Sequence, residues 1–439
     1  MATSLLQKVF AAGVVGAGGG GFPTHHKLAR RVDCVIANGA ECEPLLHNDQ
    51  ELLRVAWQEV LTGLQMVAQA TGAERVLLAI KKKNQALVAA LREAMAAAGV
   101  EISELPDCYP AGDEHEVVAL ATGRVVPEGG LPVDVGVLVH NVETLRNVAA
   151  ASQGVPVTHR FLTVAGCVQQ PRVLRAPVGT PVQELVRLCG GAQCETPAFF
   201  LGGVMMGTLS MDPDTPIDKR TAAVVVLPDE HPCVQRRRQS IEHQLRNAKS
   251  ACTQCVLCTD TCNRYLLGHR LQPHRVMRTM AVGLSSDNEV APMALLCSEC
   301  GACEYACPMG LSPRVVNREL KRLLPKPVAQ AAPPSATTPR VPLGIGRVPT
   351  ARLVARFELA PYQRPAAYWE HDVVPMRVSI RLKQHAGAPA RPTVRRGQQV
   401  SVGTVIGECN PEELSARVHA SVTGRVVHVD EEVVCIEST

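Results

Sequence analysis

The sequence predicts a multidomain protein of the α/β and α+β classes. Apolar strand-like runs alternate with helical patterns over about the first 150 residues, which is typical of an α/β domain. Two cysteine motifs lie between residues 252 and 307, and a stretch rich in Pro and Ala then leads to a β-rich C-terminus. The 439 residues are enough for about three domains that each bury a core of their own.

Composition excludes several classes of protein. The 45 Lys and Arg residues nearly balance the 41 Asp and Glu residues, and aromatic residues make up only 3%, so we expect no nucleic-acid partner. No run of 18 apolar residues exists, so we expect no membrane span. The N-terminus lacks a secretion-signal pattern, and 17 cysteines with motif spacing suit a reducing interior, so we expect a protein of the bacterial cytoplasm.

Both cysteine motifs have the spacing C-x2-C-x2-C-x3-C, which is the ferredoxin-type signature of [4Fe-4S] clusters. Three cysteines two residues apart can hold three corners of one cluster, whereas the fourth lies too far along the chain and ligates the other cluster. The expected sets are Cys252, Cys255, Cys258 with Cys307, and Cys297, Cys300, Cys303 with Cys262. Zinc, or disulfides in a secreted chain, is the alternative. Asn263 stands where a proline often follows the fourth cysteine.

The N-terminal segment predicts a helix and then a glycine-rich loop. Residues 4–12 form a short amphipathic pattern with Ser4 as the cap; this helix either packs on its own domain or serves as a docking or encapsulation peptide. Residues 16–21 match G-x-G-x-x-G, but a Rossmann turn must follow a strand, and here a helix precedes the loop. We expect a bare backbone loop that lies against a planar ring or closes on a phosphate, with Lys27 nearby; a plain linker is the alternative.

Strands are predicted at 32–37, 76–80 and 135–139, and a helix at 84–98. Polar stretches stand where strands end, at 38–44, 109–116 and 140–145, and strand ends are where α/β sheets bind ligands. The three lysines at 81–83 either contact a nucleotide phosphate or form a solvated turn.

The glycine loop and these three polar stretches resemble the flavin-carrying polypeptide of respiratory complex I and the RnfC polypeptide of the Rnf electron-transport complex. The resemblance implies an FMN domain in which NADH is the electron donor and Phe22 lies near the nicotinamide. Two departures are visible, because the complex I loop has an arginine where this chain has Ala17, and Asp113 replaces one of two glutamates. The flavin contacts that the resemblance implies are Gly16, Gly18, Lys27, Asn38, Glu41, Tyr109, Gly112, Glu114, Asn141 and Thr144.

The rest of the chain resembles further modules of the same families. Residues 161–227 resemble a β-grasp domain, either ligand-binding or a structural spacer, and 235–247 predict a helix leading into the cluster motifs. His269 and His274, between the motifs, either cap a helical insert in solvent or approach a metal. Residues 378–439 resemble a barrel-sandwich hybrid without the lysine that carrier domains modify, because Ala420, Ser421 and Val422 occupy the tip.

The domain order resembles the cobalamin reductases of propanediol-utilisation microcompartments. We expect an FMN domain at 1–155, a β-grasp domain at 156–232, a two-cluster ferredoxin-like domain at 233–323, a linker at 324–370 and a barrel-sandwich hybrid at 371–439. The resemblance implies electron flow from NADH through FMN and two clusters to cobalamin, with a corrinoid adenosyltransferase and a microcompartment shell protein as partners. An electron-transfer component of a larger complex, which serves a protein acceptor, is the alternative.

Overall fold

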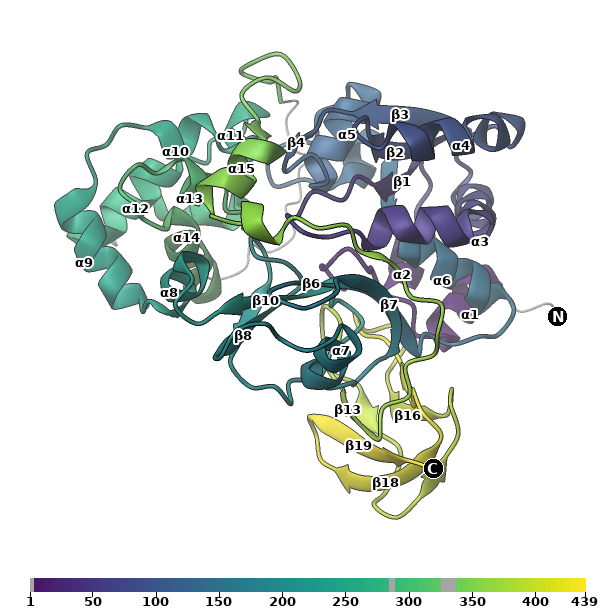
Figure 1. Cartoon of the computed structure of the whole chain (residues 1–439). Coiled ribbons are helices and arrows are strands. Elements are labelled where there is room, and N and C mark those ends of the chain that lie inside the picture. Colours follow the sequence, from purple (N-terminus) through teal and green to yellow (C-terminus); the bar gives the residue numbers. More distant parts are fainter. Residues whose placement is uncertain (1–3, 284–288, 325–336) are drawn as a thin grey trace.

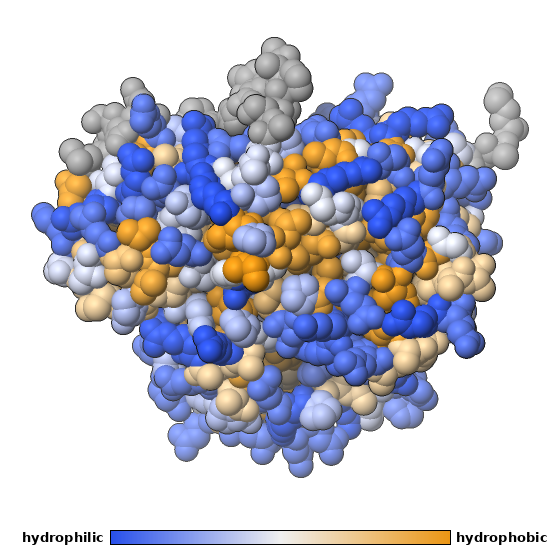
Figure 2. All heavy atoms as spheres, turned by 90° about the horizontal axis from the view of Figure 1, so that it is seen from above, coloured by the Kyte–Doolittle hydropathy of each residue, from blue (hydrophilic) through white to orange (hydrophobic). Residues whose placement is uncertain are grey.

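The computed structural model describes residues 4–283, 289–324 and 337–439. An α/β domain and a helical domain lie side by side, with a mixed β-sheet domain beneath them and a C-terminal β domain at the bottom (Figure 1). From above, hydrophilic side chains surround hydrophobic ones that gather toward the centre (Figure 2). Within the described ranges no helix is both long and apolar enough to cross a membrane.

The α/β domain is built on a parallel sheet of order β3-β2-β1-β5. The strands are β1 (Cys34–Gly39), β2 (Arg75–Lys81), β3 (Glu101–Leu105) and β5 (Val137–Asn141), so the three predicted strands are confirmed within two residues. Both sheet faces are apolar, and each is covered by helices. One face carries α1 (Leu5–Ala11), α3 (Asn48–Thr71), α4 (Gln85–Ala97) and α6 (Val142–Ser152); the other carries α5 (Glu114–Thr122).

The N-terminal helix α1 packs on its own domain. Ser4 caps it by accepting a hydrogen bond from the Gln7 amide, and Val9 is fully buried in the core. This confirms the packing alternative for the segment. The short helix α2 (Thr24–Leu28) follows the glycine loop.

The β-grasp domain is a mixed sheet of order β12-β7-β6-β10-β8-β9 with α7 (Val182–Leu188) packed on one face. The parallel neighbours β6 (His159–Gly166) and β10 (Ala223–Pro228) form its centre. The other strands are β7 (Arg172–Pro177), β8 (Pro197–Leu201), β9 (Thr208–Ser210) and β12 (Ala367–Tyr368).

The cluster domain is helical, and its entry differs from the prediction. The single helix expected at 235–247 is two helices, because Gln239 has extended backbone angles and Ser240 caps a new helix by accepting from the His243 amide. The domain comprises α8 (Pro232–Arg238), α9 (Ile241–Ala251), α10 (Leu257–Asp260), α11 (Asn263–Leu266), α12 (Pro273–Val282), α13 (Ala302–Ala306) and α14 (Pro313–Leu323).

Residues 337–370, here called the strap, are not a free spacer. The strand β11 (Val348–Pro349) pairs with β4 (Cys108–Tyr109), and β12 joins the β-grasp sheet. Helix α15 (Thr350–Arg356) lies between them and buries Leu353. The strap therefore connects the α/β and β-grasp domains, whereas 325–336 of the predicted linker lie outside the described residues. The domain boundaries themselves stay predictions.

The C-terminal domain encloses one core between two small sheets. Its tip is docked, because Ser421 is 1% exposed and its Oγ donates to the Val178 carbonyl of the β-grasp domain at 2.5 Å. The strands are β13 (Arg377–Arg381), β15 (Gln399–Val400), β18 (Gly424–Val429) and β19 (Val433–Ser438) in one sheet, and β14 (Arg391–Pro392), β16 (Val405–Glu408) and β17 (Val418–His419) in the other.

Candidate flavin and iron–sulfur site

The glycine loop, residues 16–21, is closed on itself by backbone hydrogen bonds. The Gly16 amide donates to the Phe22 carbonyl at 2.9 Å, and the Gly21 amide donates to the Gly16 carbonyl at 3.1 Å. At Gly19 and Gly20 an added Cβ would meet no atom within 4 Å, and Gly19 has a φ of +101° that favours glycine. Gly19 and Gly20 therefore expose bare backbone to open space, and such a surface suits a planar ring.

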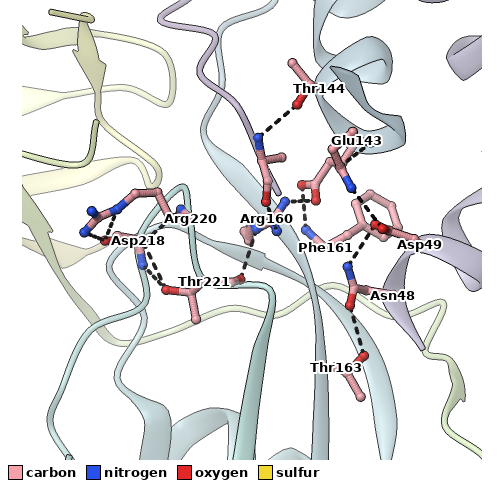
Figure 3. Close-up of polar contacts among 12 residues, drawn as sticks. Asn48, Asp49, Glu143, Thr144, Arg160, Phe161, Thr163, Asp218, Arg220 and Thr221 are labelled. Atoms are coloured by element: carbon pink, nitrogen blue, oxygen red, sulfur yellow. Dashed lines mark hydrogen bonds and ion pairs between the residues drawn. The ribbon is translucent and has the colours of Figure 1, made fainter. Parts of the chain in front are cut away.

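The base of the loop is held by α6 and by a buried arginine. The Ala17 amide donates to Thr144 Oγ1 at 2.9 Å, and Thr144 is fully buried. The Ala17 carbonyl accepts from Arg160 Nη2 at 2.7 Å. Figure 3 shows Arg160 between the loop, the start of α6 and Thr221 of the β-grasp domain. Gly18 lies against Asn141, whose Cβ would be 3.5 Å from an added Cβ.

Arg160 is the centre of this network. Its guanidinium pairs with Glu143, and both side chains are only 2% exposed. Arg160 Nε donates to the Thr221 carbonyl at 3.0 Å, and Glu143 Oε1 accepts from the Phe161 amide at 2.9 Å. Burial lowers the pKa of Arg160 to about 10, so the guanidinium is charged at neutral pH. Sequence reasoning missed Arg160, because no motif marks it and its partners are distant in the chain.

The end of β1 and the start of α5 form a second wall. Asn38 Nδ2 donates to the Gly112 carbonyl at 3.0 Å. A Cβ at Gly112 would lie 2.5 Å from the Ala40 carbonyl oxygen, so only glycine fits there. Lys27 Nζ donates to Glu114 Oε1 at 2.8 Å and is thus paired within the site. These predicted contacts lie together.

A pair of carboxyls lies beside this wall. The Asp49 amide donates to Glu41 Oε1 at 3.4 Å, and Asp49 Oδ2 accepts from Asn141 Nδ2 at 2.9 Å. Burial, and next the proximity of Asp49, raises the pKa of Glu41, while burial raises the pKa of Asp49 to about 6. Because two close carboxyls do not both ionise easily, the pair can hold one proton near neutral pH.

A cavity of about 440 Å³ adjoins this pair and has Glu41 in its lining. It lies beyond the ends of β1 and β2, under the strap, where α/β sheets bind ligands. Lys83 lines it, whereas Lys81 is 1% exposed and donates to Asp107 and to Thr350 of the strap, both at 3.1 Å. Lys81 is therefore neither in a solvated turn nor free to contact a phosphate.

Tyr109 does not present its hydroxyl to the glycine loop. The side chain is fully buried, and its hydroxyl donates to the Cys300 carbonyl of the second cysteine motif. Phe22, in contrast, is 37% exposed and open to a ligand. Tyr109 thus reaches from the flavin domain to the backbone of an expected cluster ligand.

A buried ion pair also joins the flavin domain to the cluster domain. Asp113 caps α5 and accepts from Arg264 Nη1 at 2.6 Å, and each side chain is 9% exposed. Burial would raise the pKa of Asp113, but the attraction of Arg264 prevails and lowers it. The residue that departs from the complex I pattern therefore docks the cluster domain, a role that sequence reasoning missed.

The first expected cysteine set forms one neighbourhood. Burial, and next the thiols of Cys307, Cys252 and Cys255, raises the pKa of Cys258 to about 12. Cys307, from the second motif, thus lies with the first motif. Cys255 is exposed, so this neighbourhood reaches the surface.

The second expected set forms another neighbourhood. Burial, and next Cys262, raises the pKa of Cys297 to about 12. Burial raises the pKa of Cys300, and Cys262 and Cys297 add to the effect. Burial, and next Glu304, raises the pKa of Cys303, to which Cys297, Cys300 and Cys258 of the first set also contribute. Cys303 therefore lies near both sets, and eight cysteine thiols gathered in one region suit two [4Fe-4S] clusters, which thiolates bind.

The structure gives less support to disulfides, to a zinc site and to a solvent-exposed His269. All 17 cysteines are free, so none forms a disulfide. In the described parts of the chain no three Cys, His, Asp or Glu residues converge to hold a single metal ion. His269 is buried with Nε2 3.0 Å from the Val126 carbonyl, and His274 Nδ1 lies 2.7 Å from Thr259 Oγ1. His269 is therefore not a solvated cap, as it contacts the flavin domain.

Family models match every domain. The Nuo51 FMN-binding domain matches residues 9–150, the SLBB domain 161–209, the 4Fe-4S dicluster domain 251–312 and the RnfC barrel sandwich hybrid domain 369–439. These matches confirm the predicted fold class, and the dicluster match supports clusters over zinc.

Relatives of known name match almost the whole chain. Cobalamin reductase PduS of Citrobacter freundii is 41% identical over 438 residues, which cover 99% of this chain and 96% of that protein. The protein of that name from Salmonella typhimurium is 40% identical, with the same coverage. The C component of the Na(+)-translocating ferredoxin:NAD(+) oxidoreductase complex of Acetobacterium woodii is 34% identical over 60% of this chain and 59% of that protein. The chain therefore belongs to the PduS family of cobalamin reductases.

Proposed function

We propose that the chain is an NADH-dependent cobalamin reductase. The observation that carries the proposal is the similarity to cobalamin reductases over 99% of the chain, with the flavin and dicluster domains both present. One NADH would reduce two cob(III)alamin to two cob(II)alamin, giving NAD+ and one proton. Further single-electron transfer would lead toward cob(I)alamin for coenzyme B12 recycling.

The proposed FMN site lies between the glycine loop, the end of β1 and the starts of α5 and α6. Bare backbone at Gly19 and Gly20 leaves room for the ring, and Lys27, which is paired with Glu114, would lie beside it. The carboxyl pair of Glu41 and Asp49 can hold a proton beside it. Bound FMN would accept a hydride from NADH and release the electrons singly. The exposed ring of Phe22 is where the nicotinamide would approach.

The proposed clusters use the two cysteine neighbourhoods. Cys262, Cys297, Cys300 and Cys303 would hold the cluster nearer the flavin, because Tyr109 joins Cys300 to the flavin domain. Cys252, Cys255, Cys258 and Cys307 would hold the outer cluster, whose exposed Cys255 supports an exit for electrons. The protein would set the potentials through burial and hydrogen bonds near the sulfurs.

We place this reaction inside a bacterial microcompartment of the cytoplasm, with a corrinoid adenosyltransferase and a shell protein as partners, because that setting goes with propanediol-utilisation reductases. A second function, electron delivery to a protein acceptor, is favoured by the 34% identity to the C component of the Acetobacterium woodii complex. A direct assay with cobalamin separates the two functions.

The test is steady-state turnover under anaerobic conditions with reconstituted protein. We expect NADH oxidation that depends on added cob(III)alamin, at two cob(II)alamin per NADH. Flavin-dependent NADH oxidation with an artificial acceptor but none with cobalamin would overturn the reductase proposal and favour the protein-acceptor function.

A further inference from the structure

The C-terminal domain contacts the glycine loop at Gly21 and the turn at Gly13 that precedes the loop. The Ala386 amide donates to the Gly21 carbonyl at 2.9 Å. In the preceding turn, a Cβ on Gly13 would lie 2.3 Å from the Arg417 carbonyl oxygen, and Gly13 has a φ of +64°. A Cβ on Gly21, at a φ of +61°, would lie 2.7 Å from Arg220 Cδ and 3.2 Å from His385 Cα. The C-terminal domain therefore excludes a side chain at Gly13 and packs tightly against Gly21.

A buried lysine of the β-grasp domain joins these two contacts. Lys219 is 3% exposed, and its Nζ donates to the Gly13 carbonyl at 2.8 Å and to the Arg417 carbonyl at 2.9 Å. Its backbone amide donates to Gln384 Oε1 at 2.9 Å. One residue thus ties three domains, with carbonyl oxygens as the acceptors of its side chain. Burial lowers the pKa of Lys219 to about 7, which shows how costly this position is for an ammonium group.

Helix α2 connects the C-terminal domain to residues of the proposed flavin site. His26 Nε2 lies 3.2 Å from the Glu413 carbonyl of the C-terminal domain, and its ring lies 6.3 Å from that of Phe22. The next residue, Lys27, donates to Glu114. A shift of the C-terminal domain would therefore move α2 and, with it, Phe22 and Lys27.

The C-terminal domain is also fixed to the β-grasp domain, so it is no swinging arm. The Ser379 amide donates to the Gly179 carbonyl at 2.9 Å, in addition to the contact between Ser421 and Val178. We propose that the C-terminal barrel-sandwich domain is a fixed supporting wall of the proposed flavin site and that Lys219 is the positioning residue that joins it to the turn before the glycine loop. This inference rests on the proposed flavin site.

The test compares Lys219→Met with Lys219→Arg and with Lys383→Met, a control on an exposed lysine of the C-terminal domain. The measurements are FMN affinity by fluorescence quenching, KM and kcat for NADH, and hydrogen exchange of the loop amides. We expect Lys219→Met to weaken FMN binding or raise KM about tenfold, and to speed loop exchange, because small displacements of a binding group are costly. Lys219→Arg should recover part of the loss and Lys383→Met should match the wild type.

A second variant tests the contact between Gly13 and the C-terminal domain. Gly13→Ala should reproduce the effect, whereas Gly99→Ala should not, because Gly99 has a similar φ of +71° but no atom within 4 Å of an added Cβ. Wild-type loop exchange and wild-type FMN affinity in both Lys219→Met and Gly13→Ala would overturn the inference. If the wild type itself binds no FMN, the proposed function fails, and hydrogen exchange alone still decides whether Lys219 holds the loop.

Discussion

Replacement of Arg160 by Met should release the glycine loop at its base. The variant leaves the side chain of Glu143, which is only 2% exposed, without its partner, and the loss of one member of a buried ion pair costs about 3–5 kcal/mol. The carbonyls of Ala17 and Thr221 also lose a donor, at about 1 kcal/mol each. Partial relaxation reduces the sum, so we expect a local destabilisation of about 4 kcal/mol.

Hydrogen exchange is the suitable assay, because a chain of several domains does not unfold in two states. The Phe161 amide, which donates to Glu143, and the Ala17 amide, which donates to Thr144, report on the two sides of the network. A local loss of about 3 kcal/mol or more speeds exchange by about a hundredfold or more where local opening governs it. FMN affinity should fall as well, because the loop loses its anchor.

Two controls show whether the faster exchange comes from breaking the buried pair or from the loss of any charged side chain. Arg425 and Glu437 form an ion pair at 3.4 Å in which both side chains are more than half exposed, and Arg425→Met should cost less than about 1 kcal/mol. Glu143→Gln in the background of Arg160→Met should restore part of the protection, because it removes the unpaired charge but keeps an acceptor. Exchange at Phe161 and Ala17 within about threefold of wild type in Arg160→Met would refute this reasoning.

Three further predictions concern the clusters, the interdomain ion pair and a buried histidine. Cys258→Ser should leave FMN bound and the inner cluster reducible while electron transfer to the acceptor stops; unchanged acceptor reduction would contradict the two-cluster path. Asp113→Asn should slow flavin-to-cluster transfer at least about tenfold with cofactor content preserved, because Arg264 loses its charged partner; stopped-flow absorbance measures this, and an unaltered rate would exclude a docking role for the pair. His140 is neutral in the folded protein because burial, and next Lys27, lowers its pKa to about 3, so its contribution to stability is complete above pH 6.5 and is lost as the pH falls toward 3. The stability advantage of wild type over His140→Leu should shrink by about 1.4 kcal/mol per pH unit below 6.5, measured from the ratio of the two proteins' hydrogen-exchange rates at the β5 amides at each pH, and a ratio independent of pH would contradict burial of the neutral ring.

Local patterns in the sequence predicted much of the fold. Hydrophobic periodicity located three strands of the parallel sheet within two residues, and Ser4 does cap the first helix. Cysteine spacing predicts two crossed sets of ligands, because that spacing depends on the reach of a short loop, and the structure brings cysteines of both motifs close together. The assignment of each cysteine to a cluster stays a prediction. Composition misled at the strap, where Pro and Ala hide the apolar residues that pack, such as Leu353.

The rest of the site depends on contacts between distant segments, which one sequence does not reveal. Arg160 and Lys219 are ordinary residues in their local stretches, and the carbonyls of Ala17 and Gly13 that they bind lie 143 and 206 positions away. Tyr109 belongs to a polar stretch that the resemblance assigns to the flavin, but the Cys300 carbonyl that accepts from its hydroxyl comes 191 residues later. Such interdomain contacts carry no periodicity or spacing that a linear reading could detect.

The most direct test of the central proposal is an anaerobic stopped-flow reaction. Protein reconstituted with FMN and both clusters is mixed with NADH and cob(III)alamin, and the flavin, iron–sulfur and cobalamin absorbances are followed together. We predict that flavin and clusters become reduced and that cob(II)alamin then forms through repeated NADH-dependent turnovers. Reduced flavin and clusters without any cob(II)alamin would contradict the proposal and identify the chain as a relay to a protein acceptor.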